Sequence, residues 1–264
     1  MILEAVVIVL REVLEAALLI ALLLLVSHET KVGLRWLVPA FLVGLTGALL
    51  YAWQIAWVSE QFDYAGQEIL NALLQGLIFA SICGLFVAMR AAGVHRSVIA
   101  TCMGIPIALA LAREVSEIFL YLQAFLSTET MAGPAMAGAL IGAVTGMSTG
   151  VLIYHLLGWM DQRQRDVVVP ILLAVVVAGI LTQAVSLLEQ VDRIPYSPPL
   201  WDTSGWLPEN SLLGQLLYAL LGYEATPSRW HAIIYVASLL VLFMSYRLPV
   251  STSRSPQIYA SEAS

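Results

Sequence analysis

Apolar residues run almost without interruption through seven stretches of the chain, and more polar connections separate these stretches. Each stretch approaches or exceeds the roughly 20 residues that an α-helix needs to cross the hydrocarbon core of a bilayer. The stretches cover residues of about 2–26, 36–58, 69–89, 98–125, 134–158, 167–188 and 230–247. The pattern therefore predicts an all-α integral membrane protein with seven transmembrane helices.

The outer loop 189–229 is the longest connection, and it begins with several prolines. Its middle, residues 211–223, spaces apolar residues as a helix does and reaches Gly222, a residue type that commonly ends helices. About 12 residues are too few to span a bilayer, so we expect a short re-entrant or interfacial helix here. Residues 1–247 would then form a single transmembrane domain, and the polar tail 248–264 is expected to be disordered.

Lysine and arginine are distributed unevenly between the two sides of the predicted bundle. The first, third and fifth connections and the tail hold eight of them: Lys31, Arg35, Arg90, Arg96, Arg163, Arg165, Arg247 and Arg254. The other connections hold only Arg193 and Arg229. Because cytoplasmic loops are enriched in basic residues, the N-terminus is predicted to lie outside and the C-terminus in the cytoplasm.

Two charged motifs interrupt the apolar stretches. The first is Arg11-Glu12-Val13-Leu14-Glu15, and the second is Arg113-Glu114-Val115-Ser116-Glu117. A charged side chain at the centre of a membrane helix costs about 2.5–3.5 kcal/mol on insertion scales, so such residues usually mark a functional site. The two glutamates of each motif are three residues apart and so lie on one helix face.

The motifs fall in the first and fourth stretches, which run in opposite directions if the predicted order of spans is right. This arrangement is typical of transporters built from inverted repeats, which bind their substrate near the bilayer midplane. We therefore expect one three-helix repeat over about 1–90 and a second over about 98–188. The last span, 230–247, lies outside the repeats.

Four carboxylates and two guanidinium groups leave a net charge of −2 in the apolar region if all are ionised. Oxygen donors of this kind suit hard cations such as Mg²⁺, Ca²⁺, Mn²⁺ or ferric iron. Arg11 is expected to reach Glu15, and Arg113 to reach Glu117, because each pair is four residues apart on a helix. Two other interpretations remain open at this stage, namely a charge-compensated packing device and a proton relay.

Further acidic residues could form a path from the outer face to the motifs. Glu68 lies at the outer start of the third span, Glu189 at the outer end of the sixth, and Asp202 in the outer loop. Polar residues such as Asn71, Gln75 and Gln183 could extend this path inward. For Glu68, Asn71 and Gln75, a solvated end of the third span would explain the same pattern equally well.

The overall composition excludes several classes of protein. Hydrophobic residues make up 60% of the chain and charged residues 11%, against about 25% charged residues in an average soluble domain. A net charge of −6 does not fit a nucleic-acid-binding surface. The sequence has no His-Glu-x-x-His metal site and no Gly-rich nucleotide loop, so an enzyme is the least supported class.

The duplicated Arg-Glu-x-x-Glu motif resembles the Arg-Glu-Gly-Leu-Glu motif of the high-affinity iron permeases, which include fungal ferric permeases and bacterial counterparts. The outer loop resembles that family too, through Trp201-Asp202-Thr203-Ser204, Ser211-Leu212-Leu213-Gly214, Gly222-Tyr223 and Pro227-Ser228. The seven-span plan with an outer N-terminus agrees with this resemblance. Val13, Val115, Ser116 and Asn71 depart from the family pattern.

The resemblance implies a permease that imports ferric iron across the cytoplasmic (inner) membrane. The iron ligands would be Glu12, Glu15, Glu114 and Glu117, and their charge partners Arg11 and Arg113. It also implies an external oxidase or a periplasmic iron-binding partner, and iron as transported substrate with no permanent cofactor.

Two alternatives stay open from the sequence. One is a permease or proton-coupled exchanger for another hard divalent cation, which would show a pH-dependent flux without iron. The other is a membrane sensor or assembly subunit that binds metal without transporting it. Binding without flux in vesicles would identify the second.

Overall fold

The structure is a computed structural model that describes residues 2–91, 93–126, 129–209 and 211–247. The described residues form helices and no strands, and the helices are joined by short connections and one long loop. The long helices are α1 (Ile2–Glu29), α2 (Leu37–Tyr64), α3 (Gly66–Arg90), α4 (Arg96–Leu126), α5 (Glu129–Gly158), α6 (Gln162–Gln190) and α8 (Arg229–Arg247). Two short helices, η1 (Leu34–Trp36) and α7 (Leu212–Leu221), complete the set. The tail expected to be disordered, 248–264, lies outside the described residues.

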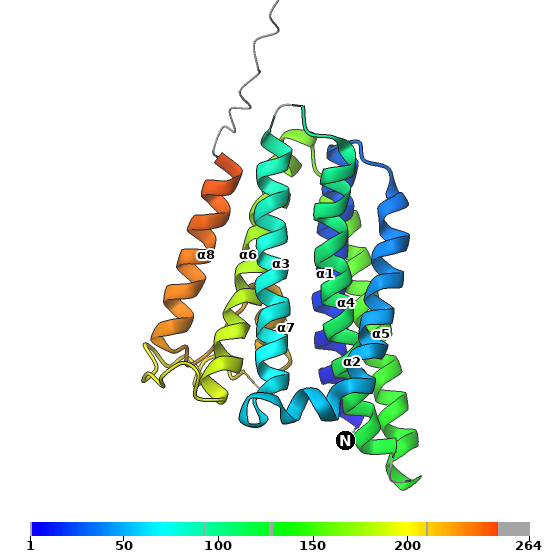
Figure 1. Cartoon of the computed structure of the whole chain (residues 1–264), viewed down its shortest axis with the longest axis vertical. Coiled ribbons are helices and arrows are strands. Elements are labelled where there is room, and N and C mark those ends of the chain that lie inside the picture. The colour runs from blue at the N-terminus through cyan, green and yellow to red at the C-terminus, as the bar shows by residue number, and fades with distance from the viewer. Residues whose placement is uncertain (1, 92, 127–128, 210, 248–264) are drawn as a thin grey trace, which may run out of the picture.

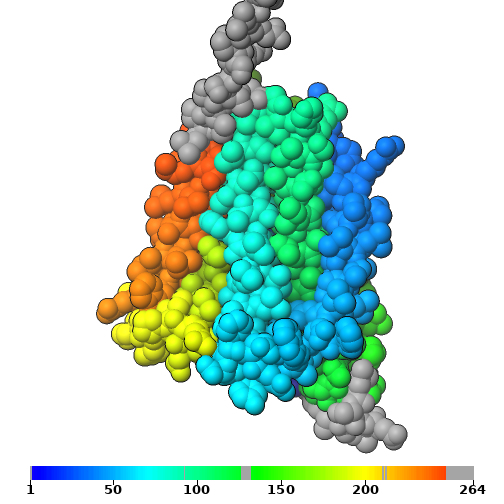
Figure 2. Space-filling model, viewed as in Figure 1, coloured from blue at the N-terminus to red at the C-terminus, as the bar shows by residue number. Residues whose placement is uncertain are grey.

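The long helices stand side by side and alternate in direction, so that the N-terminus lies at one end of the bundle and the C-terminal end of α8 at the other (Figure 1). The end far from the N-terminus therefore gathers the basic connections. These hold Lys31, Arg35, Arg90, Arg96, Arg163, Arg165 and Arg247. We call it the basic end. Figure 2 shows that the loop between α6 and α7, in yellow, fills the opposite end between α8 and α3.

Six helical segments of the described residues are long and apolar enough to cross a membrane. They are Leu34–Tyr64, Gly66–Arg90, Arg96–Phe125, Ala132–Gly158, Gln162–Gln190 and Arg229–Arg247. The protein is thus a multi-pass membrane protein. Helix α1 has the necessary length, with 28 residues, but its middle carries the three charged side chains of the first motif. A seventh span formed by α1 stays a prediction.

Two helix pairs have the most extensive contacts in the bundle, α1 with α5 and α2 with α4. Small residues explain how closely the first pair approaches. A Cβ atom at Gly142 of α5 would lie 2.5 Å from the carbonyl oxygen of Val6 on α1, a distance that no side chain tolerates. Close backbone contact through small residues is a common basis of helix packing in membranes. The small-residue face of α5 therefore fixes the position of α1.

An apolar layer closes the interior between the motifs and the basic end. It contains Leu22 of α1, Ile82 of α3, Ile107 of α4 and Leu173 of α6, all with no exposed surface. On α1 and α4, the two helices that carry the motifs, this layer lies about two helical turns from the charged residues. Because α1 and α4 run in opposite directions, both put the layer on the basic side of the motifs.

The short helix α7 forms as the sequence predicts. The Ser211 hydroxyl at its N-cap accepts a hydrogen bond from the Gly214 amide at 3.0 Å, and Gly222 ends the helix in the left-handed conformation with φ of 67°. A Cβ atom at Gly222 would lie 2.5 Å from the Cα atom of Gly179 on α6. The cap is therefore also a point where α7 contacts α6, and α7 contacts α1, the helix of the first motif, as well.

Candidate metal site

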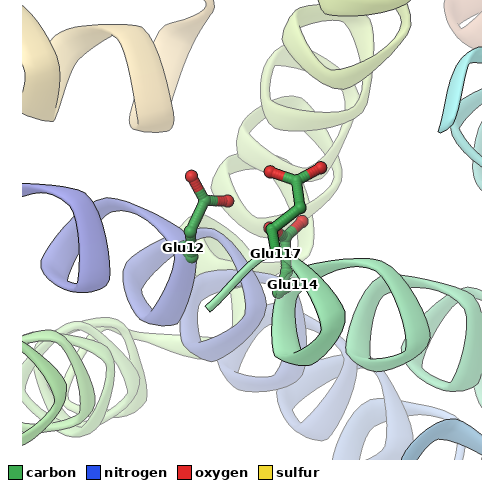
Figure 3. A group of neighbouring side chains, drawn as sticks. All are labelled: Glu12, Glu114 and Glu117. Carbon is green, nitrogen blue, oxygen red and sulfur yellow. The ribbon is translucent and has the colours of Figure 1, made fainter. Parts of the chain in front are cut away.

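Three carboxylates from the two motifs converge inside the bundle. One oxygen each of Glu12 on α1 and of Glu114 and Glu117 on α4 lie within 4.8 Å of one another, and Figure 3 shows the three side chains directed toward one region between the helices. Glu12 and Glu114 are buried, whereas the Glu117 side chain is 26% exposed. The site is therefore built from both motifs and is most accessible beside Glu117.

Arg113 is the central cation of this site. Its Nη1 atom lies 3.0 Å from Glu114 Oε1, and its Nε atom donates to Glu117 Oε1 at 3.0 Å. The same Nη1 lies 3.6 Å from Glu15 Oε2 on the other helix. One buried guanidinium thus contacts carboxylates of both motifs, which offsets part of the cost of burying them.

Arg11 is more accessible and makes longer contacts. Its Nε atom lies 3.5 Å from Glu15 Oε1 and 3.8 Å from Glu12 Oε1. Its guanidinium stacks over the ring of Tyr218 on α7, 4.3 Å from the ring centre. The pairing of each arginine with the glutamate four residues later, expected from the sequence, is present in both motifs. The contact with Tyr218 could not be expected, because nothing in the sequence places α7 over the first motif.

Glu15, the fourth glutamate, is not one of the converging three. Its side chain is 2% exposed, and its Oε1 accepts a hydrogen bond from Gln183 Nε2 of α6 at 3.1 Å. Gln183 in turn accepts from Gln75 Nε2 of α3 at 3.0 Å. The structure thus brings together three of the four predicted ligands, whereas the fourth contacts the Gln183 amide and the two arginines.

Asn71, which departs from the family pattern, has a clear place in the site. Its Nδ2 donates to Glu117 Oε1 at 3.0 Å, and its Oδ1 accepts from the Tyr51 hydroxyl at 3.0 Å. An ionised glutamate at this position could not donate to Glu117. Ser116, another departure, uses its hydroxyl on its own helix, where it donates to the Arg113 carbonyl oxygen at 2.7 Å.

Several buried oxygens of the site have no hydrogen-bond donor within the described part of the chain. They are Glu12 Oε2, Glu15 Oε2 and Glu114 Oε2. A buried acceptor without a partner usually costs about 1–3 kcal/mol, more for a charged group. A cation bound between these carboxylates would compensate their charge and give the unpaired oxygens a partner.

The predicted outer-path residues differ in their surroundings. Glu68 lies in the first turn of α3, one turn before Asn71, and its Oε2 is buried with no hydrogen-bond partner among the described residues. Asp202 lies in the exposed loop, where the hydroxyl and amide of Ser204 donate to it and lower the pKa of its carboxyl. Of the two, Glu68 is the one close to the site.

Glu189 belongs to a polar cluster that the sequence interpretation missed. Its centre is His231, buried at the start of α8, whose Nε2 lies 2.6 Å from Ser186 Oγ and whose Nδ1 lies 2.7 Å from Ser228 Oγ. Glu224 and Glu189 flank the ring at 3.2 Å from Nε2 and 3.7 Å from Nδ1. The only signal in the sequence was a histidine at the polar start of an apolar stretch, which is too common to single out.

Comparison with known proteins identifies the family. The sequence model of the Iron permease FTR1 family matches residues 96–254. This range is more than half of the chain, and it includes the second motif, the outer loop and α8. No curated protein and no solved structure matches the chain. The first motif lies outside the matched range, but it meets the second inside the bundle. The chain therefore belongs to the iron permease FTR1 family, whose members are membrane transporters and not enzymes.

Proposed function

We propose that this permease imports ferric iron across the cytoplasmic membrane, through a site that both motifs build near the bilayer midplane. Glu12, Glu114 and Glu117 would hold the ion, and Glu15 would join them during transport. Arg11 and Arg113 would keep the carboxylates in place and balance their charge. The iron is the cargo, and the proposal includes no permanent cofactor.

The convergence of Glu12, Glu114 and Glu117 within 4.8 Å is the observation that carries this proposal. If all four motif carboxylates are ionised, Arg11 and Arg113 balance only two of the four charges, so a bound cation or protons would offset the remaining repulsion. The site offers oxygen donors with neither thiolate nor imidazole among the three, which suits a hard ion. Family membership supports iron as that ion.

The arrangement of the helices supports an inverted repeat of α1–α3 and α4–α6. A two-fold axis in the membrane plane would exchange α1 with α4 and α2 with α5. It would then convert the α1–α5 contact into the α4–α2 contact, and these are the two most extensive contacts in the bundle. We propose α1 as the seventh span, with the N-terminus outside, the basic end in the cytoplasm, and rocking of the two halves as the transport movement.

On the outer side, iron would arrive from an external oxidase or a periplasmic iron-binding protein. Glu68 is the candidate for the last outer step, because this residue precedes Asn71, which donates to Glu117, by one turn of α3. Glu189 and Asp202 would act earlier on this route, since their contacts are with His231, Ser228 and Ser204.

Uptake of radiolabelled iron in cells that lack other importers tests this function. The variant is Glu114→Gln, which keeps the shape of a buried ligand and removes its charge. Glu60→Gln, at an exposed carboxylate of α2, is the matched control. Iron is supplied as Fe³⁺ citrate or as Fe²⁺ under reductant, and excess Mn²⁺ is the competitor.

We expect wild type and Glu60→Gln to accumulate Fe³⁺, and Glu114→Gln to accumulate none at an equal amount of protein in the membrane. Transport of Fe³⁺ by Glu114→Gln at the wild-type rate would refute the site. Uptake of Fe²⁺ without uptake of Fe³⁺ would refute ferric specificity, and so would full suppression of Fe³⁺ uptake by Mn²⁺. Neither result would refute the carboxylate site itself.

A further inference from the structure

Glu15 and Glu117 occupy equivalent positions in the two motifs but have different surroundings. Glu117 is partly exposed and lies with Glu12 and Glu114. Glu15 is 2% exposed, and its carboxylate has Gln183 Nε2 at 3.1 Å, Arg11 Nε at 3.5 Å and Arg113 Nη1 at 3.6 Å. Both glutamates therefore have protein partners, but only Glu117 also lies with the other two carboxylates of the candidate site.

Gln183 is oriented by a second amide. Its Oε1 accepts from Gln75 Nε2 at 3.0 Å, so its own NH₂ group must face Glu15. Gln75 has no exposed surface and Gln183 is 5% exposed, so water does not compete for these hydrogen bonds. Gln75 lies one helical turn after Asn71, the residue that donates to Glu117. Helices α3 and α6 thus each direct an amide to the last glutamate of one motif.

The amide pair is not a saturated structural network. Gln75 Oε1 is buried with no hydrogen-bond partner within the described residues. A pair that served packing alone could be replaced by apolar side chains without this cost, because replacing both partners of a buried hydrogen bond is often nearly neutral. The orientation of Gln183 toward a carboxylate beside the candidate metal site gives the pair a different role.

We propose that Gln183, oriented by Gln75, is a positioning residue that holds Glu15 away from the bound cation and releases it only as the two halves move. This inference rests on the proposed function of the site. With Glu15 held, the ion has three carboxylate ligands and can leave. With Glu15 free, it has four and is retained. A transport site must bind its ion weakly enough to release it, and the Gln183–Glu15 hydrogen bond supplies that limit.

The first measurement is Fe³⁺ binding to the purified full-length permease in lipid nanodiscs, with citrate as competing chelator. Gln183→Leu removes the donor and keeps the side-chain volume. It should bind Fe³⁺ about tenfold more tightly, the factor that corresponds to one hydrogen bond to a charged group. Gln190→Leu, at an exposed position of the same helix, should bind as wild type does. Equal or weaker binding by Gln183→Leu would overturn the proposal.

A double variant separates positioning from general disturbance. In Gln183→Leu/Glu15→Gln, the binding constant should equal that of Glu15→Gln alone, because Gln183 acts only through the Glu15 charge. A tenfold gain that persists in the double variant would show that Gln183 acts by another route. If Gln183→Leu does not fold, Gln75→Leu leaves Gln183 in place but unoriented and should shift binding in the same direction by a smaller factor.

Uptake kinetics give a readout that a merely structural role would not move. Gln183→Leu should lower both KM and the maximal rate per molecule, since the ion binds more tightly and leaves more slowly. A lower rate at unchanged KM contradicts the proposal. Glu114→Gln separates the test of the metal site from the test of the positioning role of Gln183. Normal Fe³⁺ binding by Glu114→Gln would refute the metal site itself. Loss of binding there with unchanged binding in Gln183→Leu refutes only the positioning role.

Discussion

Arg113 on α4 reaches Glu15 on α1, with Nη1 3.6 Å from Oε2, and this contact joins the two motifs directly. The same guanidinium holds Glu114 and Glu117 on its own helix. Loss of Arg113 would therefore leave Glu114 and Glu117 without their nearest cation, and Glu15 without one of its two arginine partners.

We predict that Arg113→Gln is strongly destabilising. Removing one partner of a buried ion pair typically costs about 3–5 kcal/mol, because the other charges stay buried without compensation. The amount of folded protein in the membrane and its thermal unfolding midpoint should both fall, and uptake with them. The control is Arg193→Gln, whose partner Asp63 is almost fully exposed. An unfolding midpoint for Arg113→Gln within one degree of wild type would contradict the central role of this arginine.

Tyr218 should stabilise the first motif through the face of its ring. The Arg11 guanidinium lies over that ring, and cation–π contacts contribute about 0.5–2 kcal/mol. Tyr218→Phe keeps the ring and should have little effect on the unfolding midpoint. Tyr218→Leu removes the ring and should lower the midpoint and weaken uptake. Equal midpoints for the two variants would mean that the ring face contributes nothing.

Close packing of α5 on α1 should be needed to keep the first motif in place. Gly142→Leu puts a side chain where even a Cβ atom would lie 2.5 Å from the Val6 carbonyl oxygen, so the two helices must separate. Overpacking costs about 1–3 kcal/mol or more, and uptake should fall because Glu12 moves away from Glu114. Gly133→Leu, where nothing lies within 4 Å of the Cβ position, is the control on the same helix and should transport normally.

His231 should stabilise the outer end of the bundle. His231→Ala leaves Glu189, Glu224 and two serines without the ring between them, and unsatisfied buried groups cost about 1–3 kcal/mol each. We expect a lower thermal unfolding midpoint than for His155→Ala, which changes an exposed histidine of α5. Iron binding at the motifs by the His231→Ala protein that remains folded should be unchanged, since no contact joins His231 to the motif carboxylates.

The helices were predictable because their determinants are local. Apolar stretches of membrane length, the break at Gly222 and the fixed spacing of Arg113 and Glu117 can all be read along the chain, and the observed helix bounds lie within about six residues of the predicted ones. The duplicated motif also predicted the iron permease family, and the match to the family model confirms that prediction.

The finer geometry of the site could not be predicted in this way. The last glutamates of the motifs contact amides from α3 and α6, and these amides lie 46 residues from Glu117 and 168 residues from Glu15 in the sequence. Gln183 was one of several polar residues near a helix end, and Gln75 another, with nothing to indicate that they form a pair. Such contacts are set by how helices pack against one another, and a single sequence does not record this.

The apolar layer on the basic side of the motifs has an electrical consequence. Polar and hydrated regions conduct, whereas a layer of fully buried apolar side chains such as Leu22 and Ile107 insulates, so most of the transmembrane voltage would fall across this layer. Moving one charge through a potential of 100 mV is worth about 2.3 kcal/mol, so a trivalent ion drawn to a negative interior would gain about 7 kcal/mol. In the proposed orientation, this apolar layer would let the membrane voltage itself drive a cation bound at the carboxylates inward.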